Sequence, residues 1–305
     1  MILGTILIIL SAVFFPGIIL RAKSIASGRK GPGVLQPMKD ILVLLRKGSV
    51  FSHTTSYIFQ WAPTVSLAAM ITSMLVLPFG KYDAFLSFEA DFVFFSYMLA
   101  FGKFFTIIGA LDTGSSFEGM GANREALYSM LVEPAFFILM GTFAMFTGYT
   151  SFSDIFANFF ITNNHLMIIF GLISLYLLIQ IMMIENSRLP VDDPKTHLEL
   201  TMVHEVMILD NCGFDKALIH MGTYLKFATY GSLIFASVVP AGWSLSWQIG
   251  LFLVMQFLLA TTIGLLESFR ARNKMLKNAQ FILTLSAIAL VGFVIVLIIT
   301  HKLMN

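Results

Sequence analysis

A large share of the side chains that could do chemistry in this sequence lies in one short stretch, from Glu185 to Asp210. Only 12% of the 305 residues are charged, yet this stretch, ENSRLPVDDPKTHLELTMVHEVMILD, follows directly on the apolar run LMIIFGLISLYLLIQIMMI. Its candidate functional residues are Glu185, Arg188, Asp192, Asp193, Lys195, His197, Glu199, His204 and Glu205. Carboxylates at the mouth of a hydrophobic segment can take up and release protons, because burial and neighbouring charges change their proton affinity. We therefore predict that residues 185–216, here called the central loop, take part in proton or ion transfer.

Two prolines are expected to shape the central loop. Pro190 and Pro194 disfavour helix in the residues before them, so the chain should leave the preceding helix as a stiff, extended turn. The string KTHLELTMVHEVMIL after Pro194 has few helix breakers and predicts that a helix restarts there.

Lys103 lies near the centre of a second apolar segment. A cation at that depth in a bilayer costs roughly 2.5 to 3.5 kcal/mol, so it should face a partner or water rather than lipid. Either an ion pair that holds two helices together or a place in an ion path would explain it.

Glu125, Ser129 and Glu133 recur every four residues and should share one face of a helix. A proline follows Glu133 directly and removes one backbone hydrogen bond, which opens a polar gap beside that carboxylate. The two glutamates could simply neutralise Arg124 and Lys103. Two carboxylates on one face descending into a bilayer favour a proton path instead.

The segment before these glutamates, LDTGSSFEGMGANREALYSMLVEP, is rich in glycine. Gly114, Gly119 and Gly121 are expected to permit tight turns. Asn123 is expected to cap a helix that starts at Arg124.

Metal and nucleophile chemistry are not expected in this chain. His197 and His204 share a helical face, but the string HEVMI lacks the second histidine of the H-E-x-x-H zinc pattern. A single cysteine, Cys212, cannot ligate an iron-sulfur cluster by itself, and no Walker-type phosphate loop is present. The remaining histidines lie near span ends rather than facing each other as haem ligands; they are His53, His165, His220 and His301.

The elements that must position these residues are membrane-spanning helices. The chain is 57% hydrophobic, which is typical of an all-α polytopic membrane protein. Because about 20 apolar residues cross a bilayer, we predict eight spans in one membrane domain, 1–305. They lie near residues 1–20, 57–79, 89–111, 126–149, 165–185, 217–239, 246–267 and 279–300. The net charge of +2 gives no reason to expect nucleic-acid binding.

The basic residues predict the orientation. The segments after spans 1, 3, 5 and 7 hold Arg21, Lys23, Arg29, Lys30, Lys39, Arg46, Lys47, Arg124, Arg188, Lys195, Lys216, Arg270, Arg272, Lys274 and Lys277. The opposite side holds Lys81 and Lys302. By the positive-inside rule, both termini face outward across a cell inner membrane and the charged loops are cytoplasmic.

The first cytoplasmic segment, 22–56, is too polar to span the membrane. Pro37 suits the first turn of a helix, and Met38, Ile41, Leu42 and Leu45 follow at helical spacing. This pattern predicts a helix that lies in the membrane interface, with a short cytoplasmic hairpin as the alternative.

Three strings, GPGVLQPMKDILVLL, LDTGSSFEGMGANREALYSMLVEP and the central loop sequence, resemble the membrane-anchor subunit of energy-converting hydrogenases of the hydrogenase-4 and formate hydrogenlyase type. That subunit is similar to the complex I heel subunit, which contacts the peripheral arm and borders the quinone chamber. The resemblance covers nearly the whole chain.

The resemblance implies a role for individual residues. In this resemblance, Glu133 corresponds to the intramembrane carboxylate of the family's proton path. Glu185 and Arg188 correspond to the residues at the start of the family's loop. Asp192 and Glu199 correspond to carboxylates within that loop. The implied ion path comprises Glu125, Glu133, Glu185, Asp192, Asp193, Glu199, Glu205 and Lys103. The implied interface with the peripheral arm comprises Arg124, Arg188, Lys195, His197, His204 and Gln36. Quinone-reducing relatives carry further acids where this chain has Lys195 and His197, and their counterpart of the LQP turn is longer and rich in glycine, which favours the hydrogenase branch.

The implied function is that of a non-catalytic subunit of an oxidoreductase complex. It would anchor the redox arm and couple hydrogen evolution or oxidation to proton or sodium translocation. The implied partners are hydrogenase large and small subunits, iron-sulfur subunits and antiporter-like membrane subunits, with the nickel-iron site and clusters in those partners and no cofactor in this chain. Three alternatives stay open: a quinone-chamber subunit of a complex I-type oxidoreductase, a subunit of a related complex without hydrogenase activity, and a stand-alone transporter.

Overall fold

The structure is a computed structural model that describes residues 2–80, 82–159, 165–192 and 202–304. The helices of these ranges are α1 (Ile2–Ala26), α2 (Gln36–Leu45), α3 (Tyr57–Met74), α4 (Asp91–Asp112), α5 (Ser116–Thr147), α6 (Phe152–Asn158), α7 (His165–Glu185), α8 (His204–Met207), α9 (Gly213–Val238), α10 (Leu245–Phe269) and α11 (Met275–Met304). An isolated bridge between Phe79 and Tyr82 is the β-structure in these ranges. The predicted all-α membrane fold is confirmed.

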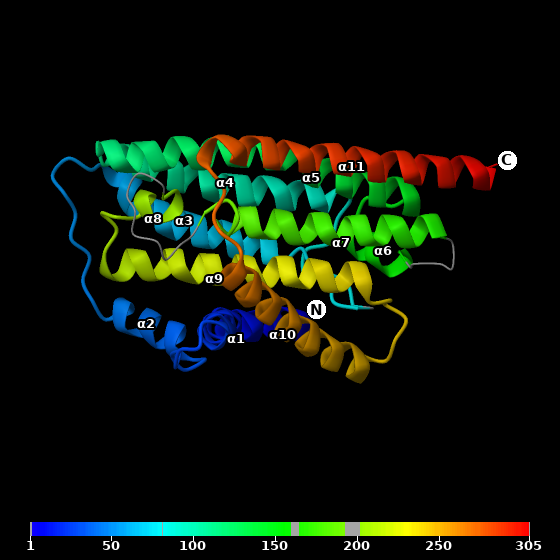
Figure 1. The fold of residues 1–305 in the computed structure, drawn as a ribbon, viewed down its shortest axis with the longest axis horizontal. Coiled ribbons are helices and arrows are strands. Elements are labelled where there is room, and N and C mark those ends of the chain that lie inside the picture. The colour runs from blue at the N-terminus through cyan, green and yellow to red at the C-terminus, as the bar shows by residue number, and fades with distance from the viewer. Residues whose placement is uncertain (1, 81, 160–164, 193–201, 305) are drawn as a thin grey trace.

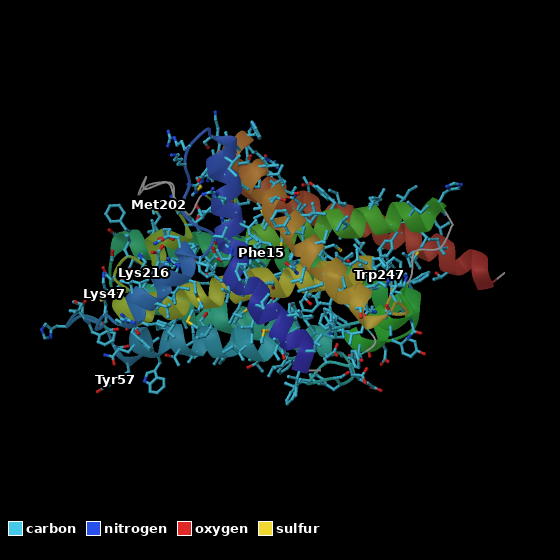
Figure 2. The ribbon with its side chains drawn as sticks, turned by 90° about the horizontal axis from the view of Figure 1, so that it is seen from below. Phe15, Lys47, Tyr57, Met202, Lys216 and Trp247 are labelled. Carbon is cyan, nitrogen blue, oxygen red and sulfur yellow. The ribbon has the colours of Figure 1, made fainter. Side chains whose placement is uncertain are left out.

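The long helices run side by side along the molecule, and α1 and α10 cross each other on one face of this bundle (Figures 1 and 2). Helix α3 packs against α4 and α9, and α5 packs against α4 and α11. Gly264 permits the crossing, because a Cβ atom there would lie 2.7 Å from the Cβ of Ala22 and 2.8 Å from the carbonyl oxygen of Ile19. Lipid provides no hydrophobic driving force for helices to associate, so small residues that let the backbones approach closely stabilise such crossings.

Large aromatic side chains fill the centre of the bundle. Phe95, Phe143, Phe152 and Phe170 are fully buried, and edge-to-face pairs such as Phe143 with Phe170, at 5.2 Å between ring centroids, link α5 to α7. The helices are apolar on nearly every face, so many large apolar side chains point outward, as expected of helices that meet lipid.

Six of the described helices are long and apolar enough to cross a membrane: α1, α4, α5, α7, α10 and α11. Each coincides with a predicted span. The other two predicted spans fall on α3 and α9, which are helical as expected but less apolar, so the count of eight crossings stays a prediction.

The bundle has two chemically different ends. Lys47, Lys216 and Met202 lie at one end and Trp247 lies at the other (Figure 2). Helix α2 forms where the interfacial helix was predicted, with Ile41 buried and Leu42 exposed. The end that carries α2 and α8 is therefore the end predicted to be cytoplasmic.

The start of α5 differs from the prediction. The helix begins at Ser116, two turns before the expected start at Arg124, so Asn123 is inside it and does not cap it. Gly119 and Gly121 are helical rather than turn residues, because both lie inside α5. Gly121 is needed for another reason, since a Cβ atom there would lie 2.8 Å from the carbonyl oxygen of Val203. It gives room for the central loop to pack on α5. Gly114 does make the turn before α5, with φ of +71°.

Candidate functional site

Lys103, near the middle of α4, is the centre of a buried ionic cluster. Its Nζ atom lies 3.1 Å from Glu125 of α5 and 3.0 Å from Glu185 at the end of α7. It also donates a hydrogen bond of 2.8 Å to the hydroxyl of Ser129. The side chain of Lys103 is only 11% exposed, so its charge is compensated by these groups rather than by solvent.

Lys226 of α9 completes this cluster. Its Nζ atom lies 3.8 Å from the Glu185 carboxylate and donates to the Glu185 backbone carbonyl at 3.2 Å. The last carbonyls of a helix have no donor within the helix and carry partial negative charge, so the C-terminus of α7 is a favourable place for a cation. Lys103, Glu125, Glu185 and Lys226, here called the ionic cluster, balance two positive charges against two negative ones.

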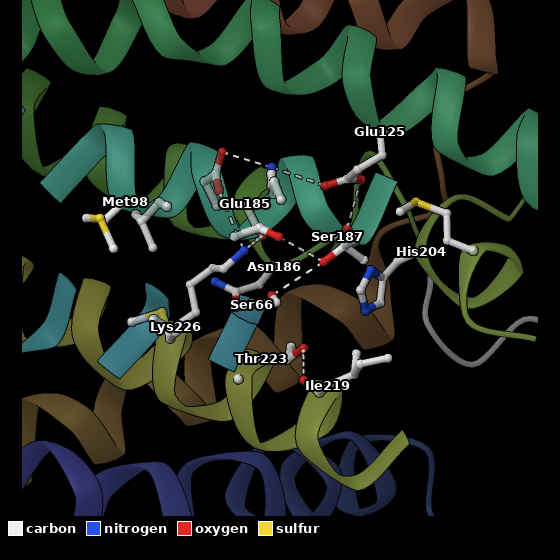
Figure 3. Close-up of a pocket in the computed structure, with 17 residues that line it drawn as sticks. Ser66, Met98, Glu125, Glu185, Asn186, Ser187, His204, Ile219, Thr223 and Lys226 are labelled. Carbon is white, nitrogen blue, oxygen red and sulfur yellow. Dashed lines mark hydrogen bonds and ion pairs between the residues drawn. The ribbon is translucent and has the colours of Figure 1, made fainter. Parts of the chain in front are cut away.

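An inner cavity of about 50 Å³ borders the ionic cluster on the side of the central loop (Figure 3). Its polar lining comprises Ser66, Thr106, Asn186, Ser187, His204 and Thr223 in addition to the cluster itself. The Ser187 hydroxyl donates to Glu125 at 3.4 Å. Sequence reasoning assigned His204 to a surface that meets a peripheral arm, whereas the structure places its ring in this cavity.

A lateral cavity of about 210 Å³ borders the cluster on the other side, between α4 and α5. Lys103, Glu133, Glu185 and Tyr230 lie along its lining. Glu133 is half-buried and makes no ion pair with any residue that the structure describes. The cavity reaches the outside of the bundle, because the lining residue Met130 is 72% exposed.

The predicted common face of α5 is confirmed, because Glu125 and Ser129 both contact Lys103 and Glu133 lines the lateral cavity beside it. Of the ion pairs suggested between the two glutamates and Arg124 or Lys103, the structure contains the one between Glu125 and Lys103. Arg124 instead donates to the carbonyl of Met202 at 3.0 Å.

Asp192 fixes the central loop. Its carboxylate lies 3.1 Å from Arg272 and accepts hydrogen bonds from the backbone amides of Val203, at 3.2 Å, and His204, at 3.1 Å. These contacts bring the residues on either side of 193–201 together. Four predicted site residues, Asp193, Lys195, His197 and Glu199, and the predicted restart of a helix after Pro194 lie outside the described residues.

Arg188 belongs to a second ionic group, on the α10 side. It lies 3.0 Å from Glu267 and 5.3 Å from the ring centre of Phe227, and Lys23 of α1 lies 3.6 Å from the same glutamate. This arrangement ties the start of the central loop to α1, α9 and α10.

The last two predicted site residues lie apart from the ionic cluster. Glu205 is half-buried in α8, next to His204. Gln36 is exposed at the start of α2, where it donates to Asp40 at 2.8 Å.

Sequence reasoning missed three anchoring residues. Glu267 and Arg272 hold the loop residues Arg188 and Asp192, and Glu118 of α5 is fully buried and accepts the Asp210 amide at 2.9 Å. A carboxylate at the end of an apolar run is a detectable signal for Glu267, but nothing in the sequence identifies its partner. Among the residues that the structure describes, no three His, Cys, Asp or Glu side chains are grouped to hold a metal ion.

Comparison with known proteins gives one family and several relatives. The sequence matches the family described as NADH dehydrogenase over residues 1–298. It is 35% identical to formate hydrogenlyase subunit 4 of Escherichia coli over 144 residues, which is 47% of each chain, so the match spans about half the length of that relative. It is 27% identical to hydrogenase-4 component C of the same organism, over 78% of this chain and 74% of the relative.

More distant similarities extend to other complexes. An NADH-quinone oxidoreductase subunit of Koribacter versatilis is 25% identical, over 67% of this chain and 50% of the relative. A chain in the structure of the membrane-bound sulfane sulfur reductase, an archaeal respiratory membrane complex, has the same fold, with a TM-score of 0.79 and 19% identity. That likeness covers 97% of this chain and 99% of the other.

Proposed function

The chain belongs to the NADH dehydrogenase family, and on that premise we propose that it is a membrane subunit of a hydrogenase complex related to complex I. It anchors a peripheral redox arm and couples electron transfer in that arm to the movement of protons or sodium ions. The observation that carries this proposal is the ionic cluster, which lies between the inner cavity on the loop side and the lateral cavity between α4 and α5.

The balance of charge in the cluster supplies a means of coupling. Both cavities are lined by Lys103 and Glu185, so a change on either side reaches the same ion pairs. Removing one partner of a buried ion pair costs about 3–5 kcal/mol, because the other charge stays buried without compensation. A change in the central loop that alters these contacts therefore alters the affinity of the cluster for protons, and the reverse follows by linkage.

The relatives suggest the partners. Formate hydrogenlyase subunit 4 and hydrogenase-4 component C are by name parts of larger enzymes. We expect hydrogenase large and small subunits and iron-sulfur subunits to dock on the end that carries α2, α8 and the central loop. The nickel-iron site and the clusters belong to those partners. Antiporter-like membrane subunits are expected beside the lateral cavity, whose lining includes half-buried Glu133.

The expected location follows from the same arrangement. The chain spans the cell inner membrane several times, with both termini outside. The docking end with Lys47 and Lys216 faces the cytoplasm, in agreement with the positive-inside rule.

Purification from the native membrane tests this proposal. The chain is tagged, extracted in mild detergent, and the copurifying proteins are assayed for nickel, iron and hydrogen formation from reduced methyl viologen. Nickel together with hydrogen formation supports a hydrogenase. Iron-sulfur proteins without nickel would indicate a related complex that lacks hydrogenase activity, and a functional chain without partners would indicate a stand-alone transporter.

A second candidate is a quinone-site subunit, which the similarity to a subunit of NADH-quinone oxidoreductase favours. Arg188 would then have to contact quinone, although it already contacts Glu267 and Phe227. A photoreactive quinone that crosslinks near Gln36 or Arg188, and is displaced by excess short-chain quinone, would support this candidate. Equal labelling with and without competitor would count against it.

A further inference from the structure

His204 connects the central loop to the ionic cluster. Its backbone amide donates to Asp192, which is itself held by Arg272. From this fixed backbone the imidazole extends into the inner cavity, where it lies beside Ser187 and on the same side as Glu125 (Figure 3). The ring therefore has a set position between the anchored loop and the cluster.

The ring also has an unused hydrogen-bonding atom. Nε2 of His204 is buried and has no hydrogen-bond partner among the described residues, whereas buried polar atoms are nearly always paired with protein or ordered water. The inner cavity, at about 50 Å³, exceeds the roughly 10–15 Å³ that a cavity needs to hold a water molecule. Glu125 and the hydroxyls of Ser66 and Thr223 line the same space and supply polar partners for water.

Titratable groups continue from His204 toward the predicted cytoplasmic end. The charged groups that act on His220 of α9 are Glu205, His204, Lys216 and Asp40. On the opposite side, Glu125 of α5 is close enough for the charge of His204 to act on it. The electrostatic neighbours of His220 therefore come from α2, α8 and α9, and those of Glu125 include His204.

We infer that His204 passes protons between the central loop and the ionic cluster, an inference that rests on the proposed function. Neutral imidazole accepts a proton at one ring nitrogen and releases a proton from the other, without any transfer of electrons. A proton from water on the loop side makes His204 transiently cationic, and a proton then reaches the Glu125 carboxylate through water in the inner cavity. Reversal of the tautomer restores His204, and the starting state returns once Glu125 has passed its proton on to the rest of the ionic cluster.

The test uses the whole complex in inverted vesicles from the native membrane. Reduced methyl viologen drives hydrogen formation, and a pH-sensitive dye reports acidification of the vesicles. H204Q keeps a polar side chain that cannot shuttle protons. We expect this variant to assemble and to form hydrogen normally, but to acidify the vesicles at least about tenfold more slowly. The expected size follows because a positioned proton-transfer group typically contributes 10²-fold or more to a rate. Added imidazole should partly restore acidification in H204A. H165Q is the matched control and should behave as wild type, because His165 lies exposed at the start of α7.

Each contrary result is decisive. Wild-type acidification in H204Q would overturn the inference, and so would loss of assembly in H204Q or failure of imidazole to restore H204A, because both indicate a structural role. Wild-type vesicles that form hydrogen without taking up either protons or sodium ions would overturn the proposed function itself and this inference with it. Sodium uptake without acidification would overturn this inference alone.

Discussion

Replacing Lys103 by methionine should destabilise the folded chain strongly, because it leaves the two carboxylates of the ionic cluster with one cation. Methionine retains most of the volume of the side chain, so the change removes chiefly charge. Lys226 would remain, at 3.8 Å from Glu185.

The size of the effect follows from the geometry. The Nζ atom of Lys103 lies 3.1 Å from Glu125 and 3.0 Å from Glu185. At an effective dielectric constant of about 20, each contact contributes roughly 5 kcal/mol of Coulomb attraction before the cost of desolvation. After that cost, removing one partner of a buried pair destabilises proteins by about 3–5 kcal/mol. We expect a loss in this range for K103M.

The double variant K103M/E185Q sharpens the test, since it restores a balance of one cation, Lys226, and one anion, Glu125. Its loss of stability should be smaller than the sum of the two single losses by at least about 1 kcal/mol. The free energy of unfolding is measured by denaturant titration in mixed micelles, with K39M as the control because Lys39 is exposed on α2. Additive losses, or a K103M variant as stable as wild type, would refute the description of these residues as one coupled cluster.

Three further results are expected. R272L should remove the contact of 3.1 Å between Arg272 and Asp192 and loosen the attachment of the central loop, which limited proteolysis would detect as faster cleavage. E133Q should change the unfolding free energy by less than about 0.5 kcal/mol, because Glu133 has no ion pair among the described residues, yet it should lower redox-driven ion uptake. G264V should separate α1 from α10 and lower stability by about 1–3 kcal/mol through overpacking, as measured by thermal unfolding.

Matched variants separate these effects from general damage. K277Q removes an exposed cation near Arg272 and should leave proteolysis unchanged. G250V places the same side chain at a glycine of α10 with open space around it and should unfold like wild type. If E133Q moves ions at the wild-type rate, Glu133 is not on the path.

Patterns within one helix could be read from the sequence. The spacing of Glu125, Ser129 and Glu133 predicted their shared face, and apolar runs predicted the six helices confirmed as candidate spans. The family resemblance was confirmed by the match over residues 1–298. Each of these signals is local, or is carried by a motif that other proteins share.

Partners from different helices could not be read in the same way. Helical periodicity fixes which residues share a face, but it does not fix how one helix is rotated against the next. The sequence therefore required a partner for Lys103 without identifying Glu185 at the end of α7. The role of Gly121 was misjudged for a related reason: this glycine lies inside α5 and serves the approach of Val203, a contact between distant segments.

The arrangement of α5 explains how the proposed coupling could use so few residues. This single helix holds the end of the central loop through Glu118, which binds the Asp210 amide, and it carries both Glu125 in the ionic cluster and Glu133 in the lateral cavity. Asp192 ties the other part of the loop to Arg272, directly before α11, which packs along α5. A displacement of the loop by a docked partner would therefore act on α5 from both attachments. Because the two carboxylates belong to that helix, the same displacement would change their distances to Lys103 together, and no redox centre within this chain is required.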